Sequence, residues 1–231
     1  VHSVFQYHDP HGDVYAYISE WLSKNVAKSY QVQLYPHVPY IVDLPQPNMN
    51  LREAIGIPKD KLVFGRHGGF KTFDIPFVKK VIERIVNERN DIVFLFLNTE
   101  KFIDHPNVVY INPLFNKQMI SNFVNACDAM LHARDLGESF GLAISEFLFF
   151  NKPVLAWDGG FDRNHVEMLS PFNSLYGVNG EDEAECYDMI VNFRDRPPMD
   201  YQSVVSPFSP KNVMEQFSRV FLDPTPTPGT P

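Results

Sequence analysis

The sequence predicts an α/β protein whose core is a doubly wound, Rossmann-like parallel sheet. From residue 61 onward, apolar runs of four to six residues alternate with segments in which apolar residues recur every three to four positions. One run, Ile92–Leu97, is apolar throughout and short, which is typical of a strand buried on both faces. The repeated alternation favours right-handed β-α-β crossovers, with helices on both faces of the sheet.

The individual elements follow from the same patterns. Pro76 suits the first turn of a helix because its missing N–H costs little there, and Asp74 is expected to cap that helix. Asn116 is expected to precede a later helix. Strands are predicted at residues 62–64, 92–97, 108–111, 129–132 and 153–156, and helices at 77–86, 119–124, 144–148, 182–193 and 211–221.

Residues 1–50 differ from the rest because short aromatic runs are punctuated by prolines. One or two short strands are expected at 13–18 and 39–43, with a helix around Ser19–Asn25 that Ser19 caps. We therefore predict three parts. These are a partial N-terminal segment or connector over 1–50, a sheet-bearing domain over 51–222, and a Pro/Thr-rich tail or linker over 223–231. The start lacks an initiator Met and a signal-peptide pattern, which suggests that the chain begins inside a longer polypeptide.

Composition argues against several function classes. The net charge is -8, and a protein that binds a phosphate backbone normally has a surplus of Lys and Arg, so nucleic acid is not expected as a partner. No apolar run reaches the roughly 18 to 20 residues of a spanning helix, so no transmembrane segment is expected. The two cysteines, Cys127 and Cys186, lack the spacing of a zinc site or a disulfide framework, which favours a reducing, cytoplasmic location.

In an open parallel sheet, ligands bind at the carboxyl ends of the strands, so the loops after each strand are the places to search. The first such loop is predicted at Gly65–Lys71. Its glycines let the backbone approach an anion closely, and Arg66 and Lys71 could both reach one diphosphate. An ordinary glycine-rich turn with solvated cations explains the pattern equally well, and the P-loop and G-x-G-x-x-G motifs are absent.

The second loop contains two carboxylates, Glu138 and Glu146, on either side of a predicted helix N-terminus. The free N–H groups there, expected at Ser139, Phe140, Gly141 and Leu142, would form an anion site. This arrangement suits a nucleotide diphosphate, with amides on phosphates and carboxylates on sugar hydroxyls. The alternative is that acidic residues simply favour the first turns of a helix.

The stretch 127–146, which contains Glu-Ser-Phe-Gly and has seven residues between its two glutamates, is followed by Asn-Lys-Pro-Val-Leu-Ala at 151–156. Together they resemble the signature of GT-B-fold glycosyltransferases, in particular the C-terminal donor-binding domain of the retaining family 4 (glycosyl transferases group 1). Arg66 and Lys71 resemble that family's arginine and lysine pair. The resemblance covers about 47–193 and extends to compact glycosyltransferase-like sequences of large algal viruses.

The resemblance implies a role for each matching position. Arg66 and Lys71 would hold the diphosphate and offset charge on the leaving group, which makes them catalytic together with Glu138. Glu138 would accept hydrogen bonds from the transferred sugar, and Glu146 from the ribose. The amides of 139–142 would bind phosphate oxygens.

Other positions on this edge carry open alternatives. The loop with Pro113 and Leu114 lies where the family packs the nucleotide base, and a plain turn explains it equally well. Asn98 falls on the same edge, but many strands end in such residues. His132 stands where the family has Pro, and it either orients the donor or is satisfied by local backbone. His67 has the same two interpretations. The turn at 158–162 resembles the Gly-Gly turn that follows a later strand in the family, but the next glutamate, Glu167, comes later in the sequence than the family pattern has it.

The function implied is transfer of a hexosyl or deoxyhexosyl group from a nucleoside-diphosphate sugar, with UDP favoured, to a glycan or glycoconjugate hydroxyl. Transfer would proceed without metal or additional cofactor and with retention of configuration. The acceptor side is largely missing from the sequence, so a further domain or subunit, or a groove built from 1–50, would complete it. The alternatives are a sugar-nucleotide epimerase and a non-catalytic nucleotide-sugar- or glycan-binding module.

Overall fold

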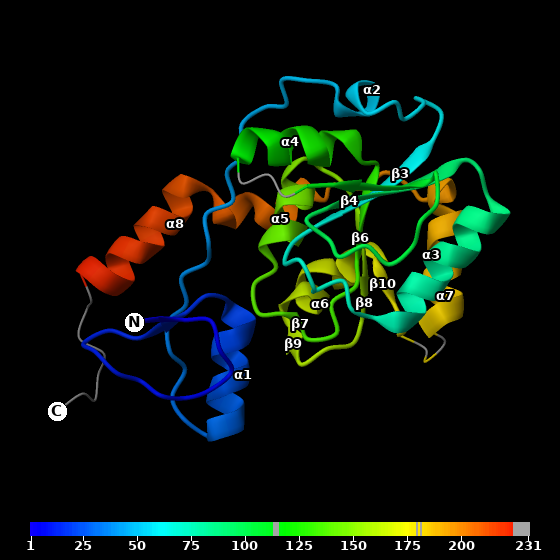
Figure 1. The fold of residues 1–231 in the computed structure, drawn as a ribbon. Helices are drawn as coiled ribbons and strands as arrows, with labels where there is room; N and C mark the ends of the chain where they lie inside the picture. Colours follow the sequence, from blue (N-terminus) through cyan, green and yellow to red (C-terminus); the bar gives the residue numbers. More distant parts are fainter. Residues whose placement is uncertain (113–115, 179, 181, 224–231) are drawn as a thin grey trace.

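A six-stranded parallel sheet forms the centre of the molecule in the computed structural model, which describes residues 1–112, 116–178, 180 and 182–223 (Figure 1). The strand order is β10-β8-β6-β3-β4-β5, and every neighbouring pair is parallel. The predicted doubly wound α/β fold is confirmed. The strands are β3 (Leu62–His67), β4 (Ile92–Leu97), β5 (Val108–Ile111), β6 (Ala129–His132), β8 (Val154–Trp157) and β10 (Leu175–Tyr176).

Helices cover both faces of this sheet and enclose two apolar cores. One face packs against α3 (Pro76–Glu88) and α7 (Asp182–Val191). The other packs against α4 (Lys117–Ala126), α5 (Leu142–Phe149) and α6 (Asn164–Leu169), with the short α2 (Leu51–Ala54) at its margin. None of the helices in the described residues is long and apolar enough to cross a membrane.

Strand β4 shows why its sequence is apolar without interruption. Val93, Leu95 and Leu97 belong to the α5 side of the sheet, and Ile92, Phe94 and Phe96 belong to the α3 side. Successive side chains of a strand point to opposite faces, so a strand covered on both faces needs apolar residues at every position.

The order of the strands reverses between β3 and β6. The chain runs from β3 outward to β4 and β5, and it then returns through α4 to place β6 on the other side of β3. Phe64 pairs with Ala129 and Gly65 with Met130 across this boundary. Open α/β sheets bind ligands at the carboxyl ends of the strands at such a reversal. The carboxyl ends of β3 and β6 are therefore where a site is expected.

The ends of several elements test the local predictions. Asn116 caps α4 and Pro76 begins α3, as predicted. The predicted Asp74 cap is wrong, because Ile75 is the N-cap and Asp74 instead accepts a hydrogen bond from the Asp135 N–H at 2.7 Å. The predicted turn at 65–67 is also wrong, because β3 continues to His67 and the turn begins after it.

The first segment forms a small body beside the sheet, and residues 43–48 lead from it along α4 (Figure 1). It contains the two-stranded parallel pair β1 (His2–Ser3) and β2 (Ala16–Tyr17), and α1 (Glu20–Tyr30), which Ser19 caps through the Leu22 N–H as predicted. The strand expected at 39–43 does not form. The predicted domain boundaries stay predictions, and the tail at 224–231 lies outside the described residues.

The last helix, α8 (Pro210–Phe217), returns to this first segment, where it packs on Ala16 and Val38 (Figure 1). A π-helical turn, Ser218–Leu222, continues it, and the helix predicted at 211–221 is thus present with a change of geometry near its end. The remaining elements are β7 (Gly137–Glu138), β9 (Asp162–Arg163) and the 3₁₀ segments Ser170–Phe172, Phe193–Asp195 and Gln202–Phe208.

Gly65 allows β3 to pack tightly against Cys127 at the C-terminal end of α4, and we expect its replacement to destabilise the sheet. A Cβ at this position would lie 2.2 Å from Cys127 Sγ. Gly65→Ala should lower the free energy of unfolding by about 1–3 kcal/mol, measured by urea denaturation. Adding Cys127→Ala removes the sulfur and should restore part of the loss. A single variant as stable as the wild type would contradict this packing.

Candidate functional site

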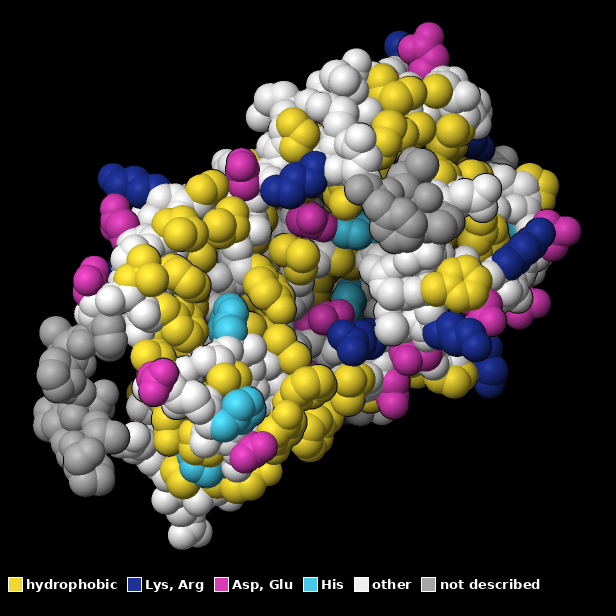
Figure 2. All heavy atoms as spheres, turned by 60° about the vertical axis from the view of Figure 1, so that its left-hand side comes forward, with side chains coloured by type: hydrophobic (Ala, Val, Ile, Leu, Met, Phe, Trp, Pro, Cys, Tyr) yellow, Lys and Arg dark blue, Asp and Glu magenta, His cyan; other side chains and the backbone are white. Residues whose placement is uncertain are grey.

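Two histidine–glutamate pairs lie at the carboxyl ends of β3 and β6. His67 ends β3, and its Nε2 lies 3.0 Å from Glu146 Oε2. His132 ends β6, and its Nε2 lies 3.0 Å from Glu138 Oε1. Figure 2 shows acidic and histidine side chains next to one another in a hollow on one face of the molecule. The structure thus places both predicted glutamates at the strand reversal.

The alternation of side chains along β3 explains how His67 meets Glu146. Arg66 lies on the α3 side, near the Phe73 ring, and His67 lies on the opposite side. There the His67 ring stacks on Phe147 of α5, with ring centroids 5.9 Å apart and an angle of 20° between the planes. Glu146 is the preceding residue of α5 and is 8% exposed. The helix therefore presents a largely buried carboxylate to the end of the strand.

Glu138 lies in the short strand β7, which pairs in parallel with β9. Its Oε2 accepts a hydrogen bond of 3.0 Å from Arg134 Nη1, while His132 engages its Oε1. Burial raises the pKa of the Glu138 carboxyl, but the hydrogen bond with His132 and the charges of His132, Arg134 and His165 outweigh it, so the net pKa is lowered. Glu138 is therefore an anion at neutral pH.

His165 lies next to His132 of the His132–Glu138 pair and is neutral. Its ring centroid lies 5.5 Å from that of His132, and its Nε2 lies 3.0 Å from the carbonyl oxygen of Trp157. Burial, followed by the charge of His132, lowers the pKa of His165 to about 4. Because the carbonyl can only accept, His165 Nε2 carries the proton of the neutral ring.

Arg66 is buried and organises the loop that follows β3. The residue is 3% exposed, and burial lowers the pKa of its guanidinium to about 10, which leaves it charged at neutral pH. Its Nη1 donates to the Asn98 carbonyl at 3.2 Å and to Thr99 Oγ1 at 2.7 Å. Its Nη2 donates to the Gly69 carbonyl at 2.8 Å and to Thr72 Oγ1 at 2.6 Å. The guanidinium thus fixes both turns at this edge.

The other predicted residues of this loop differ in exposure. Asn98 adopts a left-handed conformation with φ of 52°, and its side-chain amide donates to the Gly68 carbonyl at 2.8 Å. Lys71 is exposed, and no hydrogen bond or ion pair within the described part of the chain engages its ammonium. The loop is therefore held by Arg66 and Asn98, and Lys71 is the cation that stays available to a ligand.

Helix α5 begins later than the sequence suggests. Gly141 is its N-cap, with φ of 90°, and the helix starts at Leu142. The first four N–H groups of a helix, counted from the N-cap, have no partner within it, so the free amides are those of Gly141, Leu142, Ala143 and Ile144. Of the four positions predicted to offer amides, Gly141 and Leu142 are at this helix start, and Ser139 and Phe140 precede it.

Ser139 and Phe140 attach the Glu138 loop to the first segment. The Ser139 carbonyl accepts a hydrogen bond from Ser19 Oγ at 2.6 Å. The Phe140 side chain is 2% exposed, and its ring centroid lies 5.3 Å from that of Tyr40 and 5.1 Å from that of Phe208. The Ser139 carbonyl and the Phe140 side chain therefore anchor this loop, and the proposed phosphate contacts of the two amides stay predictions.

Two predicted base-binding residues, Pro113 and Leu114, lie outside the described residues. Within residues 1–112, 116–178, 180 and 182–223, no group of three or more His, Cys, Asp or Glu side chains is arranged to hold a metal ion. The prediction of transfer without a metal remains a prediction.

Sequence reasoning did not find the partners of the two glutamates. It gave His132 a donor-orienting role or a local backbone partner, and the structure shows a carboxylate partner instead. The available signal was the position of His67 and His132, each of which is the last residue of a strand at the reversal. Arg134 carried no signal because its contact depends on the loop that bends back through β7.

The ionised Glu138 should stabilise the fold in a pH-dependent way. Its pKa is lowered from the ordinary value of 4.5, so the stabilisation is present above that value and is lost as pH falls through the lowered folded pKa. Glu138→Gln should therefore be less stable than the wild type at neutral pH, and the difference should shrink in acid. Urea unfolding across this range measures it, with Glu83→Gln on the exposed side of α3 as control. A pH-independent difference would contradict the assignment.

Comparison with known proteins shows what this fold resembles. No protein-family model matches the chain, and no curated protein sequence matches it. Among solved structures, HepE from Anabaena in complex with UDP-glucose matches with a TM-score of 0.67 and 15% identity, over 90% of this chain and 64% of HepE. A glycosyltransferase from Rickettsia africae matches with a TM-score of 0.65 and 14% identity, over 92% of this chain and 64% of that protein.

Sucrose-phosphate synthase from Thermosynechococcus elongatus gives a TM-score of 0.61 and 13% identity, over 91% of this chain and 55% of the synthase. The chain thus spans somewhat less than two thirds of the proteins it matches. These neighbours are GT-B glycosyltransferases. The six-stranded parallel sheet and its helices therefore have the GT-B, Rossmann-like fold of these enzymes.

Proposed function

We propose that this chain binds a UDP-linked sugar at the carboxyl ends of β3 and β6 and transfers the sugar to a hydroxyl acceptor. The observation that carries the proposal is the pair of carboxylates at the strand reversal: Glu138, hydrogen-bonded to His132, and Glu146, whose Oε2 lies 3.0 Å from His67 Nε2. The fold that surrounds them is shared with HepE, whose crystal structures contain UDP, or UDP-glucose. Two fixed carboxylates on one edge suit a ligand that is rich in hydroxyl groups.

Glu146 would bind the ribose of the nucleotide. Its Oε2 faces His67, and within the described residues no hydrogen bond engages its Oε1. An ionised carboxylate only accepts hydrogen bonds, and a ribose offers two adjacent hydroxyl donors. Phe147 stacks on His67 and so limits where the imidazole can move. Glu146 is therefore preorganised for a sugar hydroxyl.

Glu138 would contact the transferred sugar. Its charge is maintained by His132 and Arg134, although burial opposes ionisation. Such a fixed anion beside the anomeric carbon would favour the positive charge that develops there as the bond to the diphosphate oxygen breaks. The new bond forms from the anomeric carbon to the acceptor oxygen, and the acceptor's hydroxyl proton passes to the departing diphosphate oxygen.

The diphosphate would lie between Lys71 and the first turn of α5. The free amides of Gly141, Leu142, Ala143 and Ile144 and the positive end of the helix dipole favour an anion. Lys71 can approach from the loop after β3, and the charge of buried Arg66 adds a favourable field. In this proposal these groups neutralise the leaving group without a metal ion. Retention of configuration and a hexosyl donor follow from the resemblance to family 4.

The acceptor would bind beside the first segment, which adjoins the Glu138 loop. Gln6 Nε2 donates to Asp162 Oδ1 at 2.6 Å, and Ser19 Oγ donates to the Ser139 carbonyl. A glycan or glycoconjugate hydroxyl reaching the donor sugar would therefore pass along residues 1–50. A further domain or subunit would complete this side.

Binding measurements separate the roles of the two carboxylates. Glu146→Gln should weaken UDP binding by about tenfold or more, because it removes the charge from a hydrogen bond to the ribose. Glu138→Gln should keep the affinity for UDP and lose the additional affinity for UDP-glucose. Isothermal titration calorimetry measures both, with Glu83→Gln as the matched control. Unchanged binding of both ligands in both variants would reject the assignment.

Product analysis tests the reaction itself. The chain should release UDP from a UDP-sugar and deliver the sugar to an added glycan acceptor, measured by UDP release and mass spectrometry of the products. Glu138→Gln should abolish transfer. Conversion of the free sugar nucleotide without UDP release would indicate an epimerase. Binding without any turnover, also in the presence of acceptors, would indicate a binding module.

A further inference from the structure

A second hollow lies at the opposite edge of the sheet. It begins beside Leu62 at the amino end of β3, Asp128 just before β6 and Pro153 just before β8. The candidate site occupies the carboxyl ends of β3 and β6, so the sheet separates the two places. The pocket has a volume of about 540 Å³, which falls within the range of small-molecule sites.

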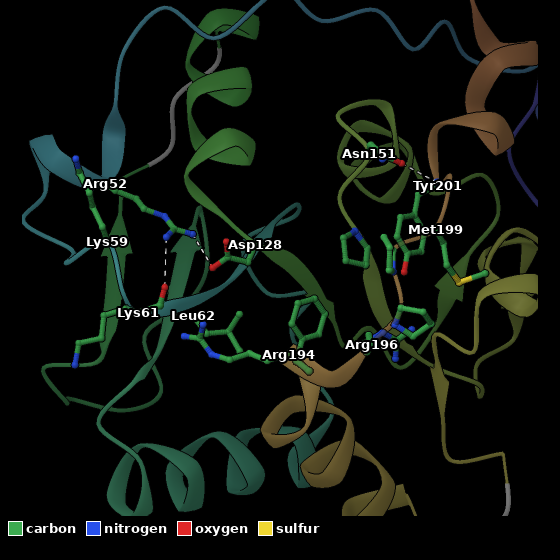
Figure 3. Close-up of a pocket in the computed structure, with 14 residues that line it drawn as sticks. Arg52, Lys59, Lys61, Leu62, Asp128, Asn151, Arg194, Arg196, Met199 and Tyr201 are labelled. Atoms are coloured by element: carbon green, nitrogen blue, oxygen red, sulfur yellow. Dashed lines mark hydrogen bonds and ion pairs between the residues drawn. The ribbon is translucent and has the colours of Figure 1, made fainter.

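Five of the chain's 20 Lys and Arg residues line this pocket, although the net charge of the chain is -8. Arg52, Lys59 and Lys61 come from the segment that leads into β3, and Arg194 and Arg196 come from the segment after α7. Figure 3 shows Arg194 reaching from its own side toward Lys61 and Leu62. Positive charge therefore converges on one space from two parts of the chain.

The acidic residue in the lining does not neutralise this group. Asp128 Oδ2 lies 2.7 Å from Arg52 Nη2 and also accepts a hydrogen bond of 2.8 Å from the Val63 N–H. Its charge is thus balanced by Arg52 alone. Four cations remain for which the pocket lining supplies no carboxylate: Lys59, Lys61, Arg194 and Arg196.

Where the remaining cations have hydrogen-bond partners, these are neutral oxygens, namely carbonyl groups and, for Arg196, also the Ser174 hydroxyl. Arg194 Nη2 donates to the Asp60 carbonyl at 2.8 Å, and Arg196 Nη2 donates to the Asn173 carbonyl at 2.9 Å. Arg194 also lies near Asp91, but that carboxylate forms a two-point ion pair with Arg89. Carbonyls orient a guanidinium without cancelling its charge. In addition, Arg196 Nε is buried and has no hydrogen-bond partner within the described residues.

We propose that this pocket binds a phosphate monoester of a small organic molecule, in a second site separate from the sugar-nucleotide site. A dianionic phosphate matches a group of cations that lacks carboxylate partners, and guanidinium groups bind phosphate through paired N–H donors. Phe193, Met199 and Tyr201 provide an apolar and aromatic wall for the organic part. An inorganic anion would use only the charged side of the pocket.

The test is calorimetric titration of glucose 6-phosphate into the full chain in the presence of saturating UDP, which keeps the candidate donor site occupied. Binding should be weakened by at least about tenfold in the Lys59→Ala/Arg194→Ala variant. The control is Lys80→Ala/Lys211→Ala, which removes the same charge from exposed positions on α3 and α8 and should bind as the wild type. Lys59→Ala alone serves as a second variant, because Lys59 makes no hydrogen bond or ion pair within the described residues.

Each outcome decides the proposal. Binding that is lost in the pocket variants and kept in the control supports it. Binding only to vesicles that contain phosphatidic acid, with the same loss, supports the phosphate chemistry and assigns a lipid as its source. No binding of either probe up to about 10 mM, equal binding by all variants, or binding abolished by UDP would overturn it.

Discussion

The pairing of β3 with β6 is the constraint on which the rest of the structure depends. The chain forms β3, continues outward to β4 and β5 and then returns, so two of the six strands separate these neighbours along the sequence. Their parallel register brings two strand ends to one edge, and each end carries a histidine. The two glutamates then arrive from separate elements, one from α5 and one from β7. A shift of one residue in this register would turn His67 away from Glu146.

Charge is distributed unevenly over the two edges of the sheet. The carboxyl edge combines two carboxylates with histidines, Arg134 and a buried Arg66, so negative and positive groups offset each other at short range. The pocket at the amino edge gathers five cations, and the acidic residue of its lining, Asp128, is paired with Arg52. A ligand with both hydroxyls and phosphates suits the first environment, and a compact anion suits the second. The net charge of the whole chain does not reveal this difference between the two edges, because composition averages over both of them.

Periodicity predicted the sheet and most helices because buried strands and amphipathic helices differ in repeat. Periodicity did not predict that Gly65–His67 belongs to a strand, because a glycine followed by two polar residues is typical of a turn. In the structure Gly65 packs against Cys127, and carbonyl and hydroxyl oxygens inside the protein accept hydrogen bonds from Arg66. Glu138 and Glu146 could be predicted from spacing and resemblance. Their histidine partners could not, because a contact between distant segments depends on which strands become neighbours and on the face that each side chain takes.

The anchoring of the Glu138 loop to the first segment has a mechanical consequence. Ser19 holds the Ser139 carbonyl, Phe140 is inserted between Tyr40 and Phe208, and Gln6 reaches Asp162 on the strand beside β7. A rotation of the first segment relative to the sheet must therefore either break these contacts or move Glu138 as well. His132 and His67 belong to the rigid sheet and would stay in place. Opening and closing at this boundary would thus change the distance between Glu138 and His132, which couples the position of the small body to the surroundings of the Glu138 carboxylate.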